Sequence, residues 1–217
     1  MCYIAGTMRH KASLIPFAIL LVTILGCGRI TERVSNAVEP KTRDEASNTF
    51  TLAGKEWKTV ELDQMDIKVD LPGQPADKSP ELSQLPSSYT EVFRSMRVHS
   101  YDDKDFQSSY TQLVPTGKRK FEIKMLADTS MAAVKKQMRD LTYTLDIQSA
   151  TNAKIKGTFT RNGKSFELRG CCIYQKTNPA RVWEVLTLYP TDNADGRTAS
   201  QKIIESVLFR GSSEECK

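Results

Sequence analysis

The chain has few histidines and lacks the short motifs of common catalytic and cofactor sites. Its 217 residues include two histidines and five cysteines, with no Cys-x-x-Cys spacing. Neither a zinc site nor a dithiol redox centre is therefore expected. It also has no glycine-rich phosphate loop, dinucleotide fingerprint or metalloprotease helix. We expect no cofactor and no metal.

No apolar run reaches the roughly 20 residues that a membrane-spanning helix needs. The main run, residues 14–25, follows Arg9 and Lys11 and ends at Gly26. A basic start, a short apolar stretch and a small residue are typical of a secretory signal that is removed on export. We predict a signal peptide over residues 1–26, with translation starting at Met1 or at Met8.

The chain has only a mild excess of positive charge. Removing Arg9 and Lys11 with the signal lowers the formal charge from +5 to +3. The one compact basic run is 118–120, which we interpret as a solvated loop. A nucleic-acid binder would concentrate basic and aromatic residues on one face, so no nucleic-acid partner is expected.

The residues 24–27, Ile-Leu-Gly-Cys, resemble the lipobox of bacterial lipoproteins. The resemblance implies that Cys27 becomes the first mature residue and carries acyl chains such as palmitate, which hold the protein on a membrane. An aspartate after the cysteine tends to retain such proteins in the inner membrane; Gly28 stands there, which favours the outer membrane. The alternative is an ordinary signal peptide and a secreted or periplasmic protein.

Residues 27–49 are polar, with few apolar side chains, and predict a flexible tether. The remainder, residues 50–217, has the size of one domain. Alternating patterns predict strands at 56–62, 65–71, 94–101, 106–114, 120–125, 154–161, 164–174 and 181–189. Asn162-Gly163 is the pair that most readily forms a type I′ hairpin turn, so 154–169 is the most secure hairpin.

Two helices are expected beside these strands. One opens at residues 128–130 and places Met131, Val134, Met138 and Leu141 at helical spacing. The other covers about 198–207. The predicted fold class is α+β, a mainly antiparallel sheet flanked by two helices in an α/β/α sandwich-like single domain. The layout, with the phrases 71–75 and 203–209, resembles extracytoplasmic domains of the PsbP-like sandwich type, which implies an accessory or binding role.

Three cysteines remain in the exported domain: Cys171, Cys172 and Cys216. Neighbours on a strand point to opposite faces, so Cys171 and Cys172 cannot both meet Cys216. Our hypothesis is a Cys172–Cys216 disulfide that pins the C-terminal tail to the sheet. The alternative is three reduced thiols, with Cys172 as a small buried hydrophobe.

His99 is the only histidine outside the signal, and any Cys-His or Ser-His-Asp catalysis would have to use it. Its place in an alternating strand favours a surface or packed residue. The acidic groups 102–105 and 192–196 have oxygen ligands that suit calcium, but they lack EF-hand spacing and are interpreted as turns.

Two classes of function remain. We prefer a lipid-anchored, non-catalytic binding or accessory module of the bacterial envelope, bound to the membrane through Cys27 and to a possible envelope protein partner. The alternative is a hydrolase-like envelope enzyme whose site one sequence does not reveal. A purely structural envelope protein would differ from the first mainly in abundance and self-association. The proline-rich loop 72–88 is a candidate contact surface, although stiffening of a solvent loop explains its prolines equally well.

Overall fold

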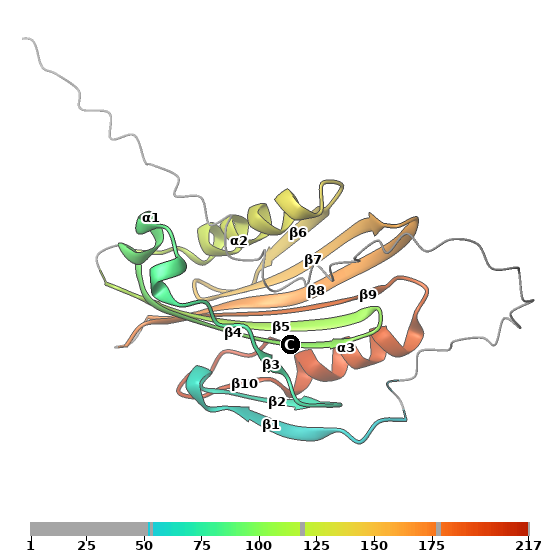
Figure 1. Ribbon diagram of the computed structural model, residues 1–217. Coiled ribbons are helices and arrows are strands. Elements are labelled where there is room, and N and C mark those ends of the chain that lie inside the picture. Colours follow the sequence, from blue (N-terminus) through green and yellow to red (C-terminus); the bar gives the residue numbers. More distant parts are fainter. Residues whose placement is uncertain (1–51, 53, 118–119, 177–178, 217) are drawn as a thin grey trace, which may run out of the picture.

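Two antiparallel β-sheets pack face to face (Figure 1). The computed structural model describes residue 52 and residues 54–117, 120–176 and 179–216. The large sheet has the order β3-β4-β5-β9-β8-β7-β6, and the small sheet has the order β1-β2-β10. The large-sheet strands are β3 (Ala76–Asp77), β4 (Phe93–Asp103), β5 (Phe106–Pro115), β9 (Arg181–Pro190), β8 (Lys164–Gln175), β7 (Asn152–Arg161) and β6 (Thr142–Ile147). The small-sheet strands are β1 (Lys58–Leu62), β2 (Ile67–Leu71) and β10 (Leu208–Phe209).

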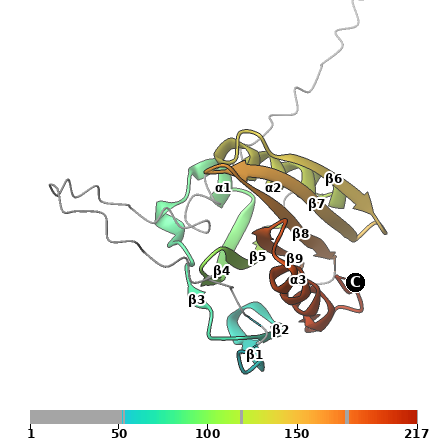
Figure 2. The ribbon, with the colours of Figure 1, turned by 90° about the vertical axis from the view of Figure 1, so that its right-hand side faces the viewer.

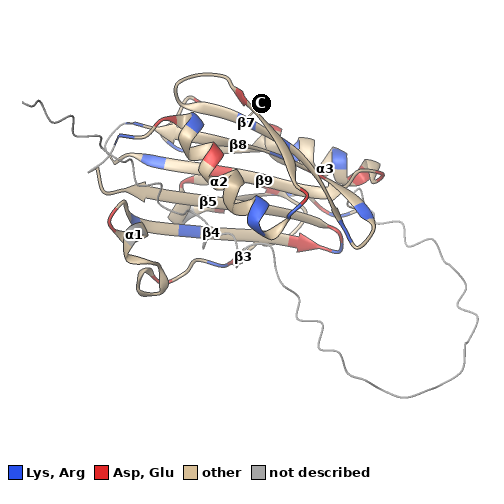
Figure 3. Cartoon of the chain, turned by 90° about the horizontal axis from the view of Figure 1, so that it is seen from above, with Lys and Arg blue, Asp and Glu red and all other residues tan. Residues whose placement is uncertain are grey.

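The large sheet has a helix on each face. Helix α2 (Ile123–Gln137) lies across one face (Figure 3), whereas α3 (Ala194–Ser206) and the small sheet cover part of the other (Figure 2). Short helical turns η3 (Asp63–Met65), η4 (Leu82–Gln84) and α1 (Ser87–Thr90) connect the early strands. Within the described residues, no helix is both long and apolar enough to cross a bilayer.

Strand alternation divides the core into two clusters, one on each face of the large sheet. Beneath α2, Met131 and Val134 pack on Ile155 and Leu168. On the α3 side, Trp183 and its neighbours pack against both the helix and the small sheet. The α2-side cluster includes Met131, Val134, Met138 and Leu141, which were predicted as one helical stripe, although α2 ends at Gln137 and Leu141 lies beyond it.

The small sheet is joined to the large one by hydrogen bonds to a single carbonyl. The indole Nε1 of Trp183 and the amide Nε2 of Gln112 both donate to the carbonyl oxygen of Met65, at 2.7 and 2.6 Å. Both donor side chains are buried, so this carbonyl satisfies two groups that would otherwise be costly to bury. The turn η3 is therefore fixed against the large sheet.

The α+β class and the central hairpins are confirmed. Strands β7 and β8 pair around Asn162 and Gly163, whose φ angles of 53° and 76° suit a type I′ turn. Strands β4 and β5 pair as predicted, and Lys104 in the acidic turn between them has a φ of 51°.

Four element assignments differ from the structure. The predicted strand 120–125 runs into α2, which begins at Ile123 because Ile123, Leu126 and Ala127 extend the apolar stripe of the helix. Helix α3 begins at Ala194 instead of residue 198, since the Asn193 side chain accepts a hydrogen bond from the backbone N–H of Gly196 at 2.8 Å. Strand β6 was not foreseen, and the loop 72–88 contains β3 and η4.

Candidate functional site

Strand β7 gives the large sheet a basic surface next to α3. Its residues alternate: Ala153, Ile155 and Phe159 belong to the core beneath α2, so Lys154 and Lys156 lie on the opposite face. On that face the buried core residues come from other strands, so the core does not cover this face of β7. The alternation that buries one side of β7 thus presents two lysines on the other.

A groove of about 610 Å³ lies over these lysines. Its floor is formed by Lys154, Lys156 and Arg169 of β7 and β8. One wall is α3, with Gln201, Ile204 and Glu205, and Cys216 of the C-terminal tail lines another part. Figure 2 shows β7, β8, α3 and the C-terminal end of the chain on the same side of the molecule. The volume lies within the range of sites for small molecules, about 300–1,000 Å³.

The groove floor carries cations that are not fully neutralised. Lys156 lies directly opposite Arg169 in the β7–β8 register. Nε of Arg169 donates to Oε1 of Glu167 at 2.5 Å. Burial lowers the pKa of Arg169, but the hydrogen bond to Glu167 and the neighbouring Tyr189 outweigh it, so the pKa is raised and the guanidinium stays charged. Among the residues described, Lys154 and Lys156 form no ion pair.

The disulfide beside the groove differs from the one we hypothesised. Cys171, not Cys172, is bonded to Cys216. The tail follows β10, which pairs with β2 in the small sheet, so it returns along the α3 side, where Cys171 points. Cys172 faces α2 and is a free, buried thiol. The predicted bridge placed the tail on the wrong face, because the pairing of β10 with β2, which sets the path of the tail, leaves no local pattern in the sequence.

Hydrogen bonds also tie the tail to the start of β7. Nδ2 of Asn152 donates to the carbonyl oxygen of Glu215 at 2.7 Å, and Oγ1 of Thr151 donates to Oε1 of Glu214 at 2.5 Å. The tail is therefore a fixed wall of the groove as long as the disulfide and these contacts are intact.

A second group of polar side chains is sealed on the other face of the sheet. Glu184 on β9 lies opposite Cys172 on β8 and Thr111 on β5, beneath α2. Its side chain accepts a hydrogen bond from Ser130 of α2, yet burial raises its pKa to about 7. The pKa of Cys172 is raised well above 9.0 by burial and by Glu184, so the thiol is protonated. Since Glu184 is 8% and Cys172 2% exposed, no substrate reaches either group in this conformation.

The structure gives His99 a packing contact and no nucleophile. Its Nδ1 lies 3.1 Å from Sδ of Met65. Burial lowers its pKa, although Asp77 acts in the opposite direction. Within the described part of the chain, no group of three or more His, Cys, Asp or Glu side chains is placed to hold a metal ion.

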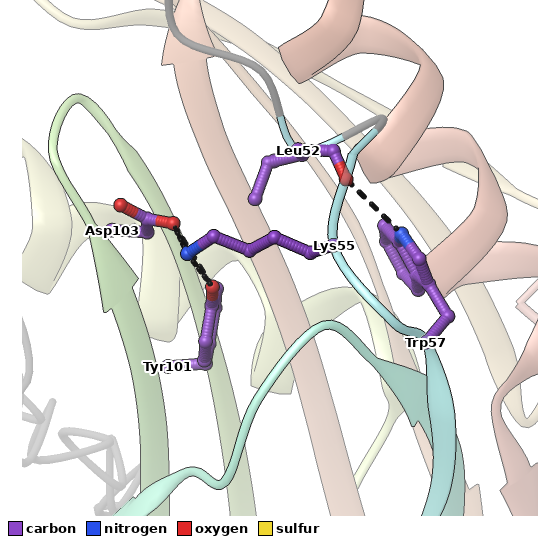
Figure 4. A network of polar contacts seen from close by, with 5 residues as sticks. All are labelled: Leu52, Lys55, Trp57, Tyr101 and Asp103. Atoms are coloured by element: carbon purple, nitrogen blue, oxygen red, sulfur yellow. Dashed lines mark hydrogen bonds and ion pairs between the residues drawn. The ribbon is translucent and has the colours of Figure 1, made fainter.

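A polar network fixes the point where the described domain begins (Figure 4). Nζ of Lys55 donates to the Tyr101 hydroxyl at 3.3 Å and forms an ion pair with Asp103. Nε1 of Trp57 donates to the carbonyl oxygen of Leu52 at 3.4 Å, and Leu52 is 1% exposed. The predicted signal, Cys27 and the tether lie outside the described residues, as do Lys118 and Arg119 of the basic run.

Comparison with known proteins gives no family. No protein-family model and no curated protein matches the chain. Among solved structures, LpqN, involved in cell envelope biogenesis of Mycobacterium tuberculosis, is similar at 14% identity and a TM-score of 0.38, covering 74% of this chain and 97% of its own. The Ran-binding protein Mog1p of Saccharomyces cerevisiae is similar at 13% identity and a TM-score of 0.37, covering 71% and 96%. Values this low carry no argument about function.

Proposed function

We propose that this chain is a non-enzymatic binding module, held on the extracytoplasmic face of a bacterial membrane by acyl chains on Cys27. The lipobox-like residues 24–27 support the anchor, Gly28 favours the outer membrane, and the polar residues 27–49 would tether the domain. The layout that resembles PsbP-like sandwiches agrees with an accessory role.

The observation that carries the binding role is the groove between β7, β8 and α3. It combines a volume suited to a small ligand with two lysines that form no ion pair among the described residues. Lys156 is exposed and Lys154 is half-buried. Charges without an ion pair in a concave site favour a ligand of opposite sign, because a groove focuses the field of its charges. The proposed ligand is therefore anionic.

The enzymatic alternative has a weaker basis. Glu184 has the raised pKa of a general acid, which is common in active sites. A catalytic acid must come within hydrogen-bond reach of its substrate, however, and α2 covers Glu184. A buried acid that packs beneath a helix supports a structural role for this group.

The anchor is tested by expressing the full chain and a Cys27→Ala variant in a bacterial host. We expect the wild type in the membrane fraction with a diacyl or triacyl mass at its N-terminus, and the modification lost in the variant. Cys2→Ala is the matched control, since Cys2 precedes the predicted cleavage and should have no effect. An unmodified N-terminus in the soluble fraction would refute the anchor.

The binding role is tested separately by native mass spectrometry after incubation with a small-molecule envelope extract. We expect an adduct with the wild type that is lost in Lys154→Gln/Lys156→Gln. Lys135→Gln/Lys136→Gln is the matched control, because it removes the same charge from exposed positions on α2. An adduct that persists in the groove variant, or no adduct with the wild type, would refute the role of the groove.

A further inference from the structure

The two sides of the groove differ in chemistry. The sheet side carries three cations, Lys154, Lys156 and Arg169, against two carboxylates, Glu167 on Arg169 and Asp146 opposite Lys154, whereas the helix side carries Gln201 and Glu205. A ligand that fits both sides must have an anionic part and an uncharged part that bears hydrogen-bond donors.

The three cations lie close enough to surround one anionic group. Lys154 and Lys156 are two residues apart on a strand, which places their Cα atoms about 6.5–7 Å apart. Lys156 and Arg169 are direct cross-strand partners, a position in which Cβ atoms are about 5 Å apart. Flexible lysine side chains can therefore converge with the guanidinium on a single group.

The donors fit a phosphate better than a carboxylate. An arginine recognises a carboxylate best through two parallel hydrogen bonds, but Nε of Arg169 is already bonded to Glu167. The lysine ammonium groups are point charges without a planar fork. A phosphate monoester offers up to two negative charges and three acceptor oxygens, which three convergent cations can share.

The helix wall fits hydroxyl groups. Nε2 of Gln201 donates to Oε1 of Glu205 at 2.8 Å. The remaining acceptor capacity of the Gln201 amide oxygen and the Glu205 carboxylate suits O–H donors. A second anion at this wall would be repelled by Glu205. Ile204 adds an apolar contact between the two polar residues.

We infer that the groove binds a phosphorylated polyol, with the phosphate on Lys154, Lys156 and Arg169 and the hydroxyl groups on Gln201 and Glu205. This inference rests on the proposed binding role and specifies its ligand. The phosphate and polyol can belong to a soluble sugar phosphate or to the headgroup of a lipid, since both present a phosphate beside hydroxyl groups, as a monoester in the first and as a phosphodiester with one negative charge in the second.

The test titrates the detergent-purified full chain with glucose 1-phosphate, inorganic phosphate and glucose by isothermal calorimetry. We expect glucose 1-phosphate to bind about tenfold more tightly than inorganic phosphate, and Lys154→Gln/Lys156→Gln to weaken it at least tenfold. Lys135→Gln/Lys136→Gln should bind as the wild type does. Glu205→Ala should reduce the preference for the sugar phosphate without abolishing phosphate binding.

Mixed micelles distinguish the two sources of the ligand. Lysine-dependent binding to micelles containing phosphatidylinositol, but not to phosphatidylcholine micelles, assigns the groove to a lipid headgroup; binding of glucose 1-phosphate alone assigns it to a soluble ligand. Either result supports the inference.

Three results would overturn the inference: no binding of any phosphorylated probe, equal affinity for phosphate and glucose 1-phosphate, or binding that the lysine variant retains. An adduct from the envelope extract that depends on Lys154 and Lys156 but contains no phosphorus would also overturn it, while leaving the proposed binding module intact.

Discussion

Glu184 should make the domain less stable as the pH rises through the neutral range. Burial beneath α2 raises its pKa from the usual 4.5 to about 7. The folded protein therefore keeps this proton up to about pH 7, whereas the unfolded chain releases it near pH 4.5. Between these values the folded state binds more protons, so the free energy of unfolding falls with rising pH.

The size of this effect follows from the width of the window. A shift of one pKa unit corresponds to about 1.4 kcal/mol, so the stabilisation present below pH 4.5 and lost above pH 7 is about 3 kcal/mol. Glu184→Gln keeps the shape and the acceptor for Ser130 but cannot ionise. The variant should match the wild type to about 1 kcal/mol in acid and exceed it by about 3 kcal/mol above pH 7.

The measurement is urea unfolding across the pH range, followed by the fluorescence of the buried Trp183. Other groups with shifted pKa values also contribute, among them His99, which acts with the opposite sign below its usual 6.5, and Cys172, which acts only above 9.0. The difference between variant and wild type removes the contribution of His99, and the comparison stays below pH 9, because Glu184 also affects the pKa of Cys172. Glu56→Gln is the control, since the Glu56 side chain is 78% exposed. The stability difference between this variant and the wild type should not change with pH.

A second variant keeps the reasoning testable if Glu184→Gln alters packing. Ser130→Ala removes the hydrogen bond that lowers the pKa of Glu184, so the pH at which stability is lost should move upward. A difference between Glu184→Gln and wild type that does not change with pH would refute a buried, titrating carboxyl at this position.

Three further outcomes are expected. Cys216→Ser removes a disulfide that spans 45 residues and should lower the free energy of unfolding by about 4 kcal/mol. A dithiol reductant should cause the same loss in the wild type and in Cys172→Ala, and no further loss in Cys216→Ser. Gly170→Ala should lower stability by about 1–3 kcal/mol in urea unfolding, because its Cβ would lie 1.9 Å from a backbone oxygen of β9, while Gly54→Ala, in open space, should not. His99→Gln should lose less stability than the wild type on acidification below pH 6.5, because burial lowers the pKa of His99. Equal acid profiles would contradict this.

The sequence predicted those elements that local pattern determines. Strict alternation and Asn162-Gly163 specify the β7–β8 hairpin without help from the rest of the fold. The start of α2 was misjudged because residues 120–125 alternate in sequence, and only packing beneath the helix makes Ile123 and Leu126 part of its stripe. Strand β6 was missed although Tyr143, Leu145 and Ile147 alternate with polar residues, so the local signal for this strand was present in the sequence.

The candidate groove was not predictable in the same way. Lys154 and Lys156 are visible in the sequence as the outer residues of an alternating strand, which is the usual pattern of a solvent-exposed face. Their role as a floor depends on α3 and the tail lying beside them, and that depends on β10 pairing with β2. Such long-range pairing leaves no local mark, and the same gap led to the wrong cysteine at the disulfide.

Strand β8 separates the two polar regions of the domain. Cys171 lies in the core on the α3 side and Cys172 faces α2, so adjacent residues belong to different environments. The sheet between them is packed on both faces, and groups without shared partners contribute nearly independently to stability. Changes at Lys154 or Lys156 should therefore leave the pH profile set by Glu184 unaltered, and Glu184→Gln should leave ligand affinity unaltered. A variant that moved both would mean that the two faces are coupled through the backbone of β8 and β9.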